Sequence, residues 1–144
     1  MKIKYTLFAC LLILGSACST IKKTDVAYVD GQINNIAWAI ISFKGQTLVP
    51  ANFPNGMPTI IFNMQDAKIG GNDGCNSFMG LATYTSTVIK PGPVASTKMA
   101  CPNVGLPADF YEVLASDKIT YHLHEGILRL YVNDAEVMAL KEKE

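Results

Sequence analysis

The sequence has no excess of charge of either sign. Its 12 lysines and arginines balance 12 aspartates and glutamates, so the composition gives no electrostatic reason to expect nucleic-acid binding. Charged residues make up only 17% of the 144 residues and hydrophobic residues 49%, which is too apolar for a disordered chain and sufficient for one domain. The sequence also lacks internal repeats and low-complexity segments. These absences favour a single small globular domain.

The apolar run at the amino terminus, residues 7–14, is shorter than the roughly 20 residues that a transmembrane helix needs. Lys2 and Lys4 precede this run, and the small residues 15–17 follow it. A basic start, a short apolar region and small residues at a cleavage site form the pattern of a secretory signal peptide. We therefore expect residues 1–17 to be a signal peptide.

Cys18 directly follows these small residues, and the site resembles a bacterial lipobox, in which cleavage exposes a cysteine that becomes lipidated. Gly15 departs from the pattern, because the position three before the cysteine usually holds a large aliphatic residue; an ordinary signal peptidase would cut the same bond. The mature chain would keep Cys18, Cys75 and Cys101, and an odd free thiol is a liability in an oxidising compartment. Lipidation of Cys18 removes that thiol, so we expect a lipid-anchored protein.

The mature chain divides into residues 18–25, a lipid anchor with a polar tether, and residues 26–144, a single domain. Glycine and proline interrupt the domain at short intervals, and β-branched and aromatic residues dominate between them, which predicts many short strands. The predicted strands are 36–43, 47–49, 59–64, 67–70, 119–124, 127–132 and 136–140, with a loop at 50–58. Residues 125–126 and 133–134 predict tight turns that join the last three strands into an antiparallel meander.

One helix is predicted over residues 106–115. Apolar side chains recur there at helical spacing, at Leu106, Phe110, Val113 and Leu114. Pro107 suits the first turn of a helix. The domain should therefore combine a sheet with a helix of about three turns.

Two short segments carry the most specific pattern in the chain. Residues 71–80 read G-x-x-G-C-N-x-F-x-G, and residues 97–101 read T-x-M-A-C. Their motif residues are Gly71, Gly74, Cys75, Asn76, Phe78 and Gly80 in the first segment, and Thr97, Met99, Ala100 and Cys101 in the second. With an early tryptophan, Trp38, these segments resemble the META domain family, whose HslJ-like members are heat-shock-type bacterial lipoproteins.

The resemblance implies a fold and a location. The fold would be mainly β, a small antiparallel barrel-like sheet with one α-helix, which is α+β in detail. The location would be the cell envelope, with no established enzymatic activity and an association with stress tolerance.

The pair Cys75 and Cys101 has three interpretations. A disulfide between them would close a segment of 101 − 75 + 1 = 27 residues and stabilise the fold by about 3.5 kcal/mol in the chain-entropy model. Two unpaired buried thiols are the second interpretation. The third is a metal site with His122 and His124, or a nucleophilic thiol, although the C-x-x-C spacing typical of zinc is missing. We expect the disulfide, because the signal sequence directs the chain to an oxidising compartment.

The sequence offers no catalytic constellation. Ser96 and Thr97 have no nucleophile-elbow pattern around them, so we expect no enzyme, no cofactor and no metal. The predicted protein is a non-enzymatic envelope lipoprotein with a stress-tolerance or binding role, on the periplasmic or surface side of the outer membrane of a Gram-negative bacterium. Its expected partners are the membrane, through the anchor, and a protein of the envelope. The alternatives are a protein-binding module that inhibits a secreted or cell-wall enzyme, and a small-molecule carrier with an open apolar interior.

Overall fold

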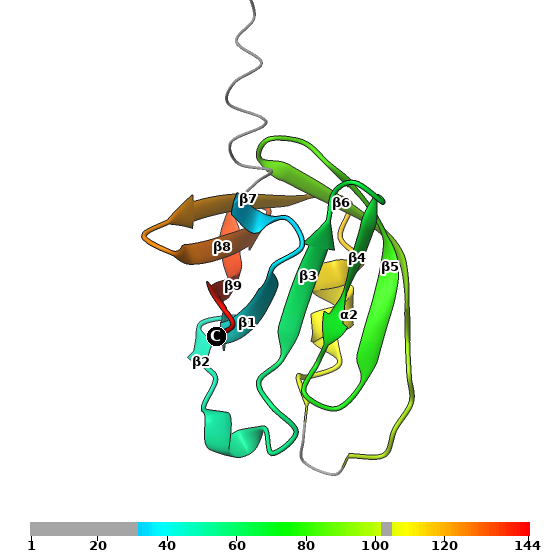
Figure 1. The fold of residues 1–144 in the computed structure, drawn as a ribbon, viewed down its shortest axis with the longest axis vertical. Coiled ribbons are helices and arrows are strands. Elements are labelled where there is room, and N and C mark those ends of the chain that lie inside the picture. Colours follow the sequence, from blue (N-terminus) through cyan, green and yellow to red (C-terminus); the bar gives the residue numbers. More distant parts are fainter. Residues whose placement is uncertain (1–31, 102–104) are drawn as a thin grey trace, which may run out of the picture.

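A computed structural model describes residues 32–101 and 105–144 of the chain. The predicted signal peptide, the predicted lipidation site Cys18 and the predicted tether lie outside these described residues. Within them, antiparallel strands form one continuous sheet that closes on itself (Figure 1).

The sheet contains β1 (Ala37–Phe43), β2 (Gln46–Thr47), β3 (Thr59–Asn63), β4 (Lys68–Asn72), β5 (Ser77–Tyr84), β6 (Val88–Ser96), β7 (Ile119–His124), β8 (Ile127–Val132) and β9 (Ala135–Glu142). From β3 onward each strand pairs with the next, and β1 pairs with both β3 and β9. The strands β1 and β3 to β9 therefore close a barrel, while β2 forms a short hairpin with β1 beside it. The predicted antiparallel barrel-like fold is confirmed.

The barrel interior is filled by side chains. Trp38 and Ile40 of β1, Ile60 and Phe62 of β3, and Leu130 of β8 are each at most 2% exposed. The alternation of inward and outward side chains along each strand places them together. A filled interior argues against a carrier with an open apolar lumen.

The two turns of the carboxy-terminal meander form where the sequence predicts them. Glu125 and Gly126 link β7 to β8, and Asn133 and Asp134 link β8 to β9. All four residues have positive φ, as two-residue hairpin turns of the primed types favour.

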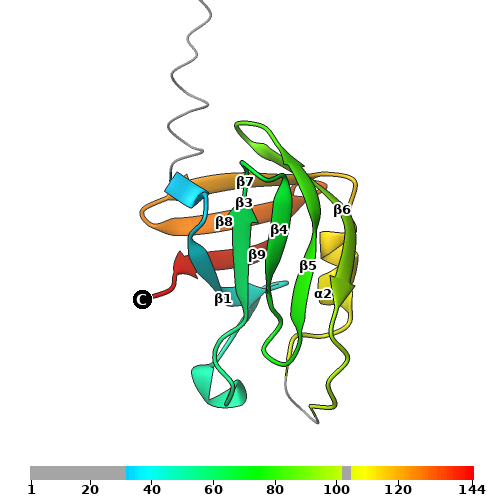
Figure 2. The same ribbon diagram turned by 45° about the vertical axis from the view of Figure 1, so that its right-hand side comes forward.

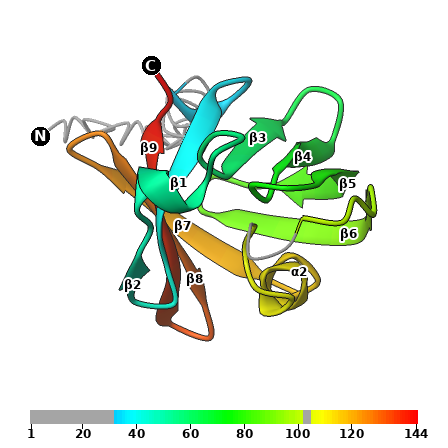
Figure 3. The ribbon, with the colours of Figure 1, turned by 90° about the horizontal axis from the view of Figure 1, so that it is seen from below.

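The strands β6 and β7 separate after a short contact. They pair only through Val88 with Thr120 and Ile89 with Ile119. The helix α2 (Asp109–Leu114) packs against β6 at this opening, as Figures 2 and 3 show from two directions. It buries Phe110 and its other apolar side chains in the core, so the helix completes the wall that the strands leave open.

The helix is shorter than the predicted range 106–115. The amide of Leu106 donates to the carbonyl of Asp73 at 2.7 Å, which ties this residue to the β4–β5 turn. The helix begins three residues later, at Asp109, and ends at Leu114.

Strands β5 and β6 are missing from the sequence prediction. Residues 70–80 read as a glycine-rich turn, yet β4 continues to Asn72 and β5 begins at Ser77. β6 contains Pro91 and Pro93, which argue against a strand in the sequence because proline has no amide hydrogen. Both prolines lie beyond the β7 pairing, where the strand has a free edge and tolerates them.

Candidate functional site

The turn between β4 and β5 is organised by Asp73, which is buried at 4% exposed. Its Oδ1 accepts the backbone amides of Cys75 at 2.8 Å and Asn76 at 2.6 Å. Its Oδ2 accepts the hydroxyl of Tyr111 in α2 at 2.8 Å. One carboxylate therefore fixes the turn and attaches the helix to it.

Tyr111 is the neutral donor in this arrangement. Burial of the phenol, followed by its hydrogen bond and charge interaction with Asp73, raises the pKa of Tyr111 to about 12. A side-chain hydrogen bond with Ser96 opposes this shift. The raised pKa extends to about pH 12 the range over which the hydroxyl keeps the proton that it donates to the carboxylate.

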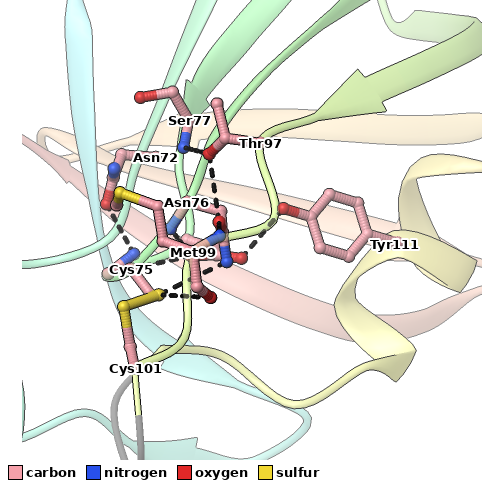
Figure 4. The surroundings of a disulfide bond; sticks show 10 residues. Asn72, Cys75, Asn76, Ser77, Thr97, Met99, Cys101 and Tyr111 are labelled. Atoms are coloured by element: carbon pink, nitrogen blue, oxygen red, sulfur yellow. Dashed lines mark hydrogen bonds between the residues drawn. A yellow bond between two sulfur atoms is a disulfide. The ribbon is translucent and has the colours of Figure 1, made fainter.

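Asn76 joins the turn to the second motif segment. Its Oδ1 accepts the amide of Met99 at 2.7 Å and the hydroxyl of Thr97 at 3.0 Å. The Thr97 Oγ1 also accepts the amide of Ser77 at 3.2 Å, and Figure 4 shows these groups facing one another. The side chains of Asn76 and Thr97 thus join the two motif segments through hydrogen bonds.

Cys75 and Cys101 form a disulfide bond, with their Cα atoms 6.0 Å apart (Figure 4). This bond agrees with the expected pairing. In the oxidised protein neither sulfur is a thiol that could bind a metal or act as a nucleophile. The disulfide adds a covalent link to the contact that Asn76 makes between the same two segments.

The two histidines of the alternative metal interpretation lie elsewhere. His122 and His124 are exposed on β7, on the outward side of a strand whose inward side carries the buried Tyr121. Across residues 32–101 and 105–144, no group of three or more histidine, cysteine, aspartate or glutamate side chains could hold a metal ion.

The motif glycines allow close backbone approach. Gly74 has φ +97°, and a Cβ there would lie 2.6 Å from Cδ1 of Phe53, which comes from the loop before β3. A Cβ on Gly71 would lie 2.0 Å from the Thr59 carbonyl oxygen, and one on Gly80 would lie 2.7 Å from the Pro93 carbonyl oxygen. Any larger side chain would push strands or loops apart at these positions.

Phe78 anchors the turn to the core. Its side chain is 4% exposed, and its ring packs edge-on against Phe110 at 5.4 Å and Tyr111 at 6.1 Å between centroids. Phe78 is therefore part of the core and is not an exposed binding platform.

The structure therefore brings the two motif segments together and adds residues that lie outside both segments. Tyr111, Phe53 and Leu106 complete the site from three other segments. None of them lies in a recognisable motif, so only the tertiary contacts reveal them. Met99 contributes its backbone to the cluster, while its side chain is 57% exposed.

A sequence model of the META domain family matches residues 31–144. The chain belongs to the META domain family. In this META domain the two motif segments, with Asp73, join the β4–β5 turn, the segment after β6 and α2. The predicted family resemblance is confirmed.

Two solved structures resemble this META domain. One is an NMR structure of a protein with 18% identity and a TM-score of 0.60, covering 78% of this chain and 92% of that one. The other is an NMR structure of a protein from Burkholderia xenovorans with 16% identity and a TM-score of 0.59, covering 81% of this chain and 87% of that one. At these identities the likeness concerns the fold alone. No curated protein matched the chain.

The described part of the chain, residues 32–101 and 105–144, includes no helix with the length and apolarity required to cross a membrane.

Proposed function

We propose that this META-domain protein is a non-enzymatic lipoprotein of the cell envelope, with a stress-tolerance or binding role there. The observation that carries the proposal is the disulfide between Cys75 and Cys101. Stable disulfides are typical of oxidising compartments such as the bacterial periplasm. With that pair bonded, Cys18 is the cysteine left unpaired after the predicted cleavage, which supports its lipidation.

A structural role for the motif supports the non-enzymatic part of the proposal. The polar groups of Asp73, Asn76 and Thr97 bond to neighbouring backbone and side chains at 2.6 to 3.2 Å. Groups held in this way stabilise the turn, whereas a catalytic group must also reach a substrate.

Metabolic labelling with a palmitate analogue tests the anchor. We expect label on the wild-type chain in bacterial cells and on a Cys10→Ser variant, since the predicted signal peptide removes residue 10. A Cys18→Ser variant should take up no label and should leave the membrane fraction. Equal labelling of the Cys18→Ser variant would contradict the proposed anchor.

Survival of a deletion strain tests the role in stress. We expect loss of the gene to lower survival under heat or envelope stress, and expect wild-type protein to restore it better than the Cys18→Ser variant. Survival identical to that of the parent strain under these stresses would contradict the stress role.

Inhibition of a secreted or cell-wall enzyme is a second candidate function. The loop before β3, which contains η1 (Pro50–Asn52), projects from one end of the barrel in Figure 1. Val49 beside it is 50% exposed, and residues 54–56 are exposed. A protruding loop suits insertion into a partner's cleft. Capture of one envelope enzyme by the wild-type chain, but not by a Val49→Ser variant, would support this candidate.

A further inference from the structure

Large apolar side chains cluster on the outer face of β3, β4 and β5, where a sheet face in contact with water usually carries polar side chains. Ile61 is 38%, Met79 63% and Leu81 61% exposed. Ile61 pairs with Gly70, and Gly70 pairs with Met79, so these three residues form one row across three strands. Leu81 lies two residues along β5 from Met79 and therefore on the same face. We call these exposed residues, with Gly70, the aliphatic face.

Glycines leave shallow depressions beside these side chains. One depression of about 250 Å³ is lined by Gly70, Ile61 and Met79, with Lys68 at its side. A second, of about 360 Å³, is lined by Gly92 and Leu81, with Lys90 at its side. Each depression thus combines an apolar floor with one ammonium group.

The strands that form the aliphatic face carry charge of one sign. The strands β3 to β6 of the described sheet contain no aspartate or glutamate, and their charged residues are Lys68 and Lys90. Two acidic residues lie in the turns beside these strands: Asp73 is buried, and the exposed Asp66 in the β3–β4 turn accepts a hydrogen bond from Asn63. On the opposite side of the barrel β9 carries acidic residues, including Glu136. The aliphatic face therefore complements a surface that is apolar and negatively charged.

We propose that the aliphatic face lies against an anionic lipid surface. The side chains of Ile61, Met79 and Leu81 would enter the layer below the headgroups, and the two lysines would reach lipid phosphates with their ammonium groups. Protein interfaces favour aromatic, methionine and arginine side chains and disfavour lysine. This face has one methionine, no aromatic or arginine side chain and two lysines, so a lipid surface fits it better than a protein partner.

The proposal rests on the proposed function only for proximity to the membrane. From Cys18 to Gln32 the chain has 32 − 18 = 14 residues, which span at most about 48 Å when extended. This length allows a small anchored domain to lie with one side on the bilayer.

A photoreactive benzophenone side chain placed at Met79 tests the contact in the full chain. The matched control carries it at Glu136 on β9, and both proteins are mixed with vesicles of phosphatidylcholine with or without phosphatidylglycerol. After irradiation we expect lipid adducts at position 79 with the anionic vesicles, at a yield at least fivefold above position 136. Retention of the disulfide and an unchanged circular dichroism spectrum show that both proteins are folded.

Charge variants test the lysines. Lys68→Gln combined with Lys90→Gln should lower the adduct yield at position 79 by roughly fivefold for each lysine removed. Lys118→Gln combined with Lys141→Gln removes the same charge on the β7–β9 side and should leave the yield unchanged.

Other outcomes overturn the proposal. Equal lipid yields at positions 79 and 136 would show that the face has no preference, and adducts to a second copy of the chain would assign it to self-association. Adducts to a protein on irradiation of whole cells would assign it to a protein partner. Palmitate labelling separates this test from the anchor: lipid adducts without label at Cys18 would refute the anchor alone, and label without adducts would refute the membrane contact alone.

Discussion

Replacing Asp73 with alanine is the most direct perturbation of the motif cluster. The change leaves the amides of Cys75 and Asn76 and the hydroxyl of Tyr111 without their acceptor. Hydrogen bonds to a charged group contribute roughly 1.5–3 kcal/mol each, and water can replace part of this for the two donors that are only part-buried. We therefore expect Asp73→Ala to lower the free energy of unfolding by about 3–5 kcal/mol.

That loss is large beside the roughly 5–15 kcal/mol that stabilises a typical domain. Asp73→Asn keeps an acceptor oxygen for the two backbone amides, and its side-chain NH2 can donate to the hydroxyl oxygen of Tyr111. This change should therefore lower the free energy of unfolding by only about 1–2 kcal/mol.

Urea denaturation followed by the fluorescence of Trp38 measures these changes. Trp38 is the single tryptophan of the chain and is 2% exposed, so its emission reports loss of the core. Asp66→Ala is the matched control, because Asp66 also bonds within a turn, to Asn63, but is exposed. It should cost less than about 1 kcal/mol. A cost for Asp73→Ala no greater than that of Asp66→Ala would refute the reasoning.

Three further predictions concern the same cluster. Replacing both Cys75 and Cys101 with alanine should lower the free energy of unfolding in urea by about 3.5 kcal/mol, and an unchanged midpoint would contradict this. Gly74→Ala should cost about 2–3 kcal/mol by overpacking and strain, whereas Gly126→Ala, at φ +75° with open space around it, should cost only about 1 kcal/mol by strain. The pKa of Tyr111 is raised from 10.0 to about 12, so the folded state holds the phenol proton more tightly than the unfolded chain does. The contribution of this proton to the free energy of unfolding is complete below pH 10 and is lost as the pH rises from 10 to about 12. Tyr111→Phe should therefore flatten the fall in stability at alkaline pH. An unchanged pH profile of stability would contradict a role for Tyr111.

Local sequence predicts much of the carboxy-terminal half of the barrel. β7 and β8 have the bounds expected from the sequence, 119–124 and 127–132. Alternating apolar residues and two-residue turns are both local signals, since a turn needs positive φ only at its own residues. The same reasoning finds β1 and β3 within a residue at each end.

The strands β5 and β6 could not be read from the sequence in the same way. Glycines near the start of β5 and prolines inside β6 are turn residues by local preference. They are compatible with strands here because Gly80 lets the Pro93 carbonyl approach and because β6 has a free edge beyond Ile89. Both reasons are properties of neighbouring strands.

The candidate site likewise has some features that local sequence predicts and others that depend on tertiary contacts. Residue types at short spacing are enough to identify the two motif segments and a pair of cysteines that could bond. Tertiary contacts are needed to show that the segments meet, that Tyr111 donates to Asp73 and that Phe53 lies against Gly74. They are also needed to show that aliphatic and lysine side chains from several strands share one outer face. Such contacts join residues up to 38 positions apart, and their placement follows from strand register and barrel closure, which no local pattern encodes.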